Sequence, residues 1–158
     1  MPIRMTSKMK ITDSDHGYRN MVNQLVEADG KRVLVGWFER SRIPGTNSSE
    51  LRMAILNEFG KFDGDRAGNA PLRMMFDKNE DLFLKLLGAD AYKRLLSGDK
   101  ISVVLHDFAD EAKRMLSKQV VEPGSVGRFP EEHGKDYGRS ERILRALSDR
   151  VEAKIEDA

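Results

Sequence analysis

Apolar and polar residues follow two different periods along this chain of 158 residues. A period of two over residues 3–11 predicts a strand. A helical period follows over 18–26 and stops at Asp29 and Gly30, a pair that favours a tight turn. Residues 31–38 are rich in β-branched and aromatic side chains and predict the strongest strand of the chain. The first third therefore predicts strand, helix and strand, followed by a loop over 41–49.

Two amphipathic stretches, joined by a loop of Gly, Asp and Asn, occupy residues 51–87. The first predicts a helix with Ser48 or Ser49 as its N-cap and Gly60 at its end. Its apolar residues recur at helical spacing, so we expect them to form the buried face. That face consists of Leu51, Ala54, Ile55 and Phe59. The residues expected to point elsewhere are Arg52, Asn57 and Glu58.

The second stretch predicts a helix with Pro71 in its first turn, where a missing N–H costs nothing, and with Gly88 as its stop. Phe59 and Phe76 end apolar stripes on either side of the loop, so we expect both to be buried beside each other. The buried stripe of this second helix is expected to consist of Leu72, Met75, Phe76, Leu82, Phe83, Leu86 and Leu87.

The remaining third predicts further helices around a long loop. A short helix over 89–96 is broken by Ser97 and Gly98, and Asp99 is placed to cap the most regular helix of the chain. That helix carries a single apolar stripe between residues 101 and 116. The Gly- and Pro-rich segment 122–140 predicts a long loop. The last stretch is ambiguous, because its apolar spacing suits a helix at first and a strand near its end.

Composition narrows the function. The chain is 39% hydrophobic and 34% charged, which permits only a modest core and favours further burial against other subunits. Its net charge of +1 gives no global field that would attract nucleic acid or an anionic membrane. The absence of Cys excludes disulfides, thiol catalysis and thiolate metal sites. No apolar run reaches the length of a membrane span, and we expect no membrane partner.

Candidate catalytic and metal-binding residues are few. Asp63 and Asp65 begin a segment like a calcium loop, but Ala67 and Met74 stand where oxygen ligands are required, so a flexible turn is favoured. The three histidines are far apart in sequence. No Ser lies in a nucleophile elbow. One acidic cluster has metal-ligand types but lies in the Gly-rich loop without second-shell support, and a polar interaction loop is favoured there. It consists of Glu131, Glu132, His133 and Asp136. We therefore expect no enzyme activity and no cofactor.

Residues 54–77 contain a two-part sequence motif. The tetrapeptide 57–60 reads Asn-Glu-Phe-Gly, and a short loop separates it from a Pro-Leu-Arg segment followed by Phe. This order resembles the signature of tailed-phage tail-completion proteins, the neck or head–tail joining proteins that include the minor tail protein Z type. The chain departs from the family pattern where an Arg-Pro-Phe sequence is reduced to Ala70 and Pro71. The matching residues are Asn57, Glu58, Phe59, Gly60, Pro71, Leu72, Arg73 and Phe76.

The resemblance implies a fold and a function. It favours a helix to about residue 147 and a strand after residue 149 that returns to the sheet. Pattern and resemblance together predict one α+β domain over 1–158, a small antiparallel sheet packed by amphipathic helices, with a long flexible loop before the C-terminal helix and strand. The implied function is structural: a homo-oligomeric, hexameric ring in the virion neck, assembled in the host cytoplasm. Its implied partners are the head connector or adaptor and the tail terminator or tail tube.

The loop over 122–140 is expected to be an assembly element, because it has too few apolar residues to order itself. Its candidate interface residues, with those that follow, are Val126, Phe129, Tyr137, Arg139 and Arg142. The alternative function is a nucleic-acid-binding accessory protein that uses the C-terminal arginines on phosphates. Neighbouring acidic residues dilute those arginines, which favours a mixed solvated face. In a neck ring the same arginines can face passing DNA without sequence specificity.

Overall fold

The computed structural model describes residues 17–43, 49–59, 70–122 and 137–158, with only the backbone given for 137–141. The strand predicted over 3–11 lies outside these ranges. So do Gly60 and most of the loop predicted over 122–140. The described residues form an α+β fold in which helices pack against a small antiparallel sheet, as the sequence predicts.

The sheet pairs a strand that follows the first helix with the strand at the C-terminus. Helix α1 (Tyr18–Ala28) ends at Asp29, and Gly30 has a φ of 78° that suits the tight turn into β1 (Lys31–Gly36). Strand β1 pairs antiparallel with β2 (Glu152–Asp157), with Val33 opposite Ile155. The strand predicted over 31–38 and the helix-then-strand order at the C-terminus are both confirmed.

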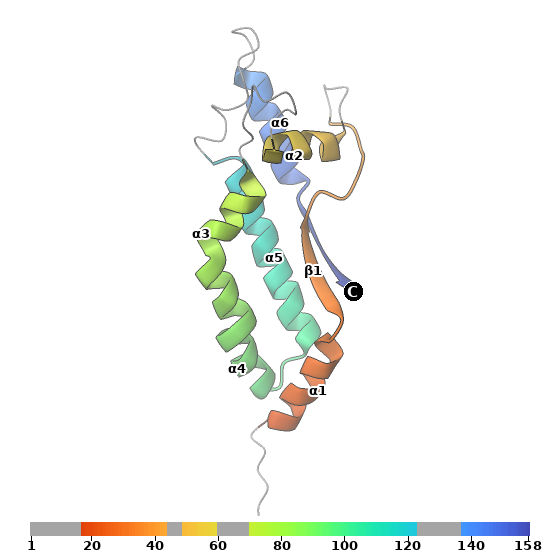
Figure 1. Cartoon of the computed structure of the whole chain (residues 1–158), viewed down its shortest axis with the longest axis vertical. Helices are drawn as coiled ribbons and strands as arrows, with labels where there is room; N and C mark the ends of the chain where they lie inside the picture. The colour runs from red at the N-terminus through yellow and green to blue at the C-terminus, as the bar shows by residue number, and fades with distance from the viewer. Residues whose placement is uncertain (1–16, 44–48, 60–69, 123–136) are drawn as a thin grey trace, which may run out of the picture.

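Helix α5 (Ile101–Val120) runs through the middle of the molecule, with α3 on one side and the two-stranded sheet on the other (Figure 1). Its predicted apolar stripe is confirmed, because the stripe residues are buried or half-buried along the whole helix. The fully or nearly fully buried members are Ile101, Val104, Ala109, Ala112, Met115 and Leu116. Helix α5 is therefore the element against which both strands and most of the other helices pack, whereas α2 packs against α3 and α6.

Helix α3 (Pro71–Lys85) does not stop at Gly88, as the sequence predicted. It continues through a π-helical turn, η1 (Leu86–Asp90), into α4 (Ala91–Leu96). A helical Gly costs about 1 kcal/mol relative to Ala. The burial of Phe83 before the turn and of Leu95 after it offsets that cost. The helix ends instead at Ser97 and Gly98, where the φ of Gly98 is 104°.

Two apolar clusters form the core. The larger lies between α2 (Glu50–Phe59), α3, α5, α6 (Tyr137–Asp149) and the residues that flank the strands. Within it the indole Nε1 of Trp37 donates a hydrogen bond to the carbonyl oxygen of Leu147 at 2.8 Å. The smaller cluster joins α1, α4 and the first turn of α5. None of the described helices is long and apolar enough to cross a membrane.

A polar contact ties α3 to the end of α5. The ammonium of Lys78 donates to Glu122 Oε2 at 2.8 Å and to Gln119 Oε1 at 3.3 Å. The hydrogen bond from Lys78 is the main cause that lowers the pKa of the Glu122 carboxyl below its ordinary value. A lowered folded-state pKa means that the pair contributes stability above the ordinary carboxyl pKa. The contribution is lost as pH falls through the lowered value.

Replacing Lys78 with Ala is therefore expected to raise the pKa of Glu122 towards its ordinary value. An NMR pH titration of the side-chain carboxyl carbon of Glu122 measures this directly. Lys113→Ala removes an exposed cation from the same helix α5 and is the control that should leave Glu122 unchanged. A Glu122 pKa that stays low in Lys78→Ala would refute the assignment.

Candidate functional site

The two halves of the tail-completion-like motif meet at the junction of α2 and α3. The carboxylate of Glu58 accepts hydrogen bonds from the backbone amides of Leu72 at 2.8 Å and Arg73 at 3.2 Å. The amide of Ala70 donates to the carbonyl oxygen of Asn57 at 3.2 Å. Residues that are fourteen and fifteen positions apart in sequence are thus joined by their polar groups.

The role of Glu58 follows from its place in front of a helix. The first amides of any helix lack intrahelical partners, and the helix dipole favours a negative charge there. Pro71 occupies the first helical position and needs no partner, so the next two amides are the ones that remain. Glu58 satisfies both while being almost fully buried. The motif Glu is therefore a capping residue supplied by the preceding helix.

This arrangement corrects the predicted orientation of α2. The buried positions of that helix are Glu50, Ala54, Asn57 and Glu58, whereas Phe59 is 69% exposed and Ile55 is also exposed. The predicted burial of Phe59 is wrong because Glu58 must face the start of α3, and rotating the helix to bring it there turns the Ile55 and Phe59 side chains outward.

The predicted burial of Phe76 is also wrong, since its side chain is 46% exposed. Helix α5 covers a narrow stripe of α3 that contains Met75 and Phe83, and Phe76 lies at the edge of that stripe. Its ring contacts Phe83 with centroids 5.4 Å apart. Leu82 and Leu87, also predicted to be buried, are exposed for the same reason.

A second buried carboxylate fixes the other end of α2. Glu50 is 2% exposed, and its Oε2 accepts a hydrogen bond from the hydroxyl of Ser41 at 2.9 Å. The guanidinium of Arg150 approaches the same oxygen at 3.6 Å and donates to the carbonyl oxygen of Arg42. Ser49 accepts from the amide of Arg52 at 3.3 Å, which confirms the predicted N-cap. Sequence reasoning missed Glu50, which reads as an ordinary first-turn acid.

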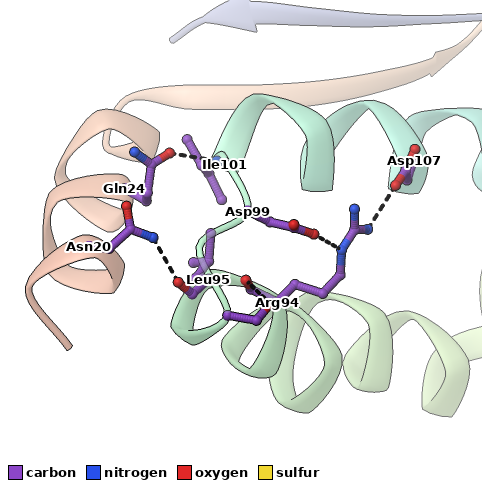
Figure 2. A network of polar contacts seen from close by, with 8 residues as sticks. Asn20, Gln24, Arg94, Leu95, Asp99, Ile101 and Asp107 are labelled. Atoms are coloured by element: carbon purple, nitrogen blue, oxygen red, sulfur yellow. Dashed lines mark hydrogen bonds and ion pairs between the residues drawn. The ribbon is translucent and has the colours of Figure 1, made fainter. Parts of the chain in front are cut away.

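The turn between α4 and α5 is held by polar side chains (Figure 2). Arg94 binds Asp99 at 2.7 Å and Asp107 at 2.8 Å, and these hydrogen bonds, Asp99 first, raise the pKa of the Arg94 guanidinium. Asp99 is therefore not the N-cap of α5 that the sequence predicted. The amide of Ile101 instead donates to Gln24 of α1 at 2.6 Å. The network locks helices together, and Arg94 and Asp107 also line a pocket of about 360 Å³ beside Asp90 and Lys93.

Helix α1 is attached through the same turn. The side-chain amide of Asn20 donates to the carbonyl oxygen of Leu95 at 2.7 Å, and Figure 2 shows Asn20 and Gln24 pointing from α1 towards α4 and α5. Met21 is buried between these two polar contacts. One face of α1 is therefore fixed to the domain, and its opposite face is left to solvent.

An apolar groove runs along α3 and η1 beside α5. Its volume is about 600 Å³. Phe83 stacks edge-on against Phe108 with centroids 5.4 Å apart, so the aromatic wall of the groove is continuous from α3 to α5. The side chain of Leu84 is 65% exposed at its margin. The lining residues are Phe76, Asp77, Glu80, Phe83, Leu84, Leu87, Gly88 and Phe108.

The remaining candidate residues are placed as follows. Arg142 lies exposed on α6, and Tyr137 and Arg139 belong to the first turns of that helix, where only the backbone is described. Arg150 is engaged with Glu50 and does not join Arg142 in a free basic patch. Those that lie outside the described residues are Gly60, Val126, Phe129, Glu131, Glu132, His133, Asp136, Asp63 and Asp65.

Metal-ligand side chains do not gather in groups of three or more within 17–43, 49–59, 70–122 and 137–158. His106 is exposed on α5. Among the described residues, the polar contacts described above cap and lock helices, and the groove beside α3 presents an apolar surface with an acidic rim.

Comparison with known proteins adds no relative to this arrangement. No protein-family model, no curated protein and no solved structure matches the chain. The function proposed below is supported by the motif residues, their geometry and the exposed apolar surfaces.

Proposed function

We propose that this protein is a structural subunit of the tail-completion type, which assembles with copies of itself into a ring that joins a phage tail to the head connector. The observation that carries the proposal is the exposure of large apolar side chains on separate helices. Val26 on α1 is 71% exposed, and Phe59 on α2 and Leu84 on α3 are exposed to a similar extent. Exposed apolar side chains that gather on a folded domain indicate an interaction site, and Phe76, Leu84 and Leu87 gather in this way along the groove beside α3.

The motif supports this proposal in a specific way. Glu58 and the start of α3 are occupied with each other, so the polar half of the motif serves the fold. The aromatic half, Phe59 and Phe76, faces outward and is available to a neighbour. Such a motif suits a subunit of an assembly, because its polar half stabilises the fold and its aromatic half can contact a neighbouring subunit.

A connector of this kind works by geometry. Each subunit offers two different surfaces, and a head-to-tail contact repeated around an axis closes into a ring when the rotation between subunits divides a full turn. The exposed apolar surfaces on α1 and on α3 are different surfaces on one subunit. Burial of both at each contact would supply the driving force for assembly.

Analytical ultracentrifugation and negative-stain electron microscopy of the full-length protein test the proposal. We expect a concentration-dependent shift from monomer to one closed oligomer, visible as ring-shaped particles, and the same protein in the neck of the virion. A protein that stays monomeric at all concentrations and is absent from purified virions would overturn the proposal. Salt-sensitive binding of the monomer to DNA would then favour a nucleic-acid-binding function.

A further inference from the structure

The groove beside α3 is shaped for a helix. Its walls are aromatic and aliphatic, and the rings of Phe76, Phe83 and Phe108 contact one another in series. At Gly88 a Cβ atom would meet nothing within 4 Å, so the groove is open there. Amphipathic helices commonly bind by laying an apolar face into such a groove.

The rim of the groove is acidic. Asp77 and Glu80 line it, and both carboxylates are exposed. Neither has an ion-pair partner among the described residues. The groove therefore favours a helix with an apolar stripe bordered by a positive charge, because such a helix would bury the aromatic wall and pair with the rim.

Helix α1 presents a stripe with these properties. Tyr18, Val22, Leu25 and Val26 are all exposed and stand at positions i, i+4, i+7 and i+8, which share one helical face. Arg19 comes one turn before Val22 and borders the stripe, and because it already takes part in another interaction, pairing with the acidic rim would share or exchange that contact. The opposite face of α1 is fixed to α4 and α5 by buried and hydrogen-bonded residues. The stripe is therefore preorganised, which lowers the entropic cost of docking it.

The two surfaces also agree in length. At 1.5 Å per residue, the α1 stripe from Tyr18 to Val26 is about 12 Å long, and the groove from Phe76 to Leu87 is about 16 Å long. Helix α1 lies at the end of the molecule, below the sheet, whereas the groove residues of α3 lie higher on the other side of α5 (Figure 1). One subunit therefore does not fill its own groove.

We infer that α1 of one copy docks in the groove between α3 and α5 of the next copy. This inference rests on the proposed function and names the contact that builds the ring. The contact is heterologous, since it joins two different surfaces, and each subunit makes it twice, once with each neighbour. Closure of the ring then adds avidity that a single pair lacks.

Site-specific cross-linking tests the contact. The chain has no Cys, so introduced thiols are the only ones present. Two full-length variants, Leu84→Cys and Val22→Cys, are purified separately, mixed, and treated with a short bismaleimide. We expect a cross-linked dimer that requires both variants, and a ladder up to the closed oligomer when both substitutions are in one chain. His106→Cys, on the exposed face of α5 away from the groove, is the matched control for Leu84→Cys and should not link to Val22→Cys.

A blocking substitution provides the second measurement. Gly88→Leu places a side chain in open space, so the monomer should fold normally by circular dichroism. The same side chain would obstruct a docked helix, and we expect self-association to weaken at least about tenfold. Gly88→Ala is the smaller control and should assemble nearly as the parent does.

The outcomes separate the inference from the function on which it rests. Ring particles without a link between positions 84 and 22, or with Gly88→Leu assembling unchanged, would overturn the inference and leave the ring intact. Efficient linking of Leu84→Cys to itself would replace the inferred contact with a two-fold contact between grooves. A protein that never self-associates would overturn both.

Discussion

Replacing Trp37 with Ala is expected to lower the free energy of unfolding by about 3–5 kcal/mol, the range for large core aromatics. Trp37 is buried in the larger apolar cluster between the end of β1 and the C-terminal helix α6. Its indole Nε1 also donates to the carbonyl oxygen of Leu147, which joins residues 110 positions apart. Truncation to Ala leaves a cavity and removes this link between the two ends of the fold.

Urea unfolding followed by far-ultraviolet circular dichroism measures the effect, because Trp37 is the only Trp and its fluorescence is lost in the variant. Trp37→Phe keeps an aromatic ring but no donor, and should cost about 1–2 kcal/mol because the carbonyl of Leu147 still accepts from the amide of Arg150. Val26→Ala, at an exposed position, should have little effect. A loss below about 1 kcal/mol for Trp37→Ala would contradict the packing described here.

Replacing Glu58 with Ala is expected to cost about 1–3 kcal/mol, which is large for a polar residue. The substitution leaves the amides of Leu72 and Arg73 without their acceptor at the start of α3. It also removes the negative charge that the helix dipole favours there. Urea unfolding followed by Trp37 fluorescence gives the stability, and hydrogen exchange at residues 72 and 73 shows whether the loss is local.

Two controls separate capping from other effects. Glu58→Gln keeps a side-chain carbonyl in the same place and should retain part of the stability while losing the charge. Phe59→Ala alters the neighbouring residue, and because that side chain is exposed the cost should stay below about 1 kcal/mol in the monomer. Wild-type protection of residues 72 and 73 in Glu58→Ala would show that the capping assignment is wrong.

The regular elements of this protein could be predicted from sequence because their signals are local. The apolar stripe of α5 repeats over many turns, so each residue reinforces the same assignment. Gly30 and the residues of β1 define a turn and a strand within a few positions.

The face that α2 buries, the continuation of α3 through Gly88 and the role of Asp99 could not be predicted in this way. In each case the deciding partner is distant or belongs to another element. Glu58 turns α2 towards the free amides of α3, and Gln24 of α1 caps α5 in place of Asp99. Apolar periodicity within α2 cannot show that burying the Glu58 carboxylate is more favourable than burying the Phe59 ring, because the amides that bind the carboxylate belong to α3.

The sequence by itself therefore determined where most of the described helices and strands lie, because backbone propensity and side-chain period act within a few residues. Only the tertiary structure decided which side chains of α2 and α3 face solvent. That choice depends on free energies of contact between elements, and a buried, fully hydrogen-bonded carboxylate at a helix start outweighs the burial of one aromatic ring at its edge. The exposed surfaces on which assembly is proposed, at Phe59, Phe76 and α1, follow from that choice.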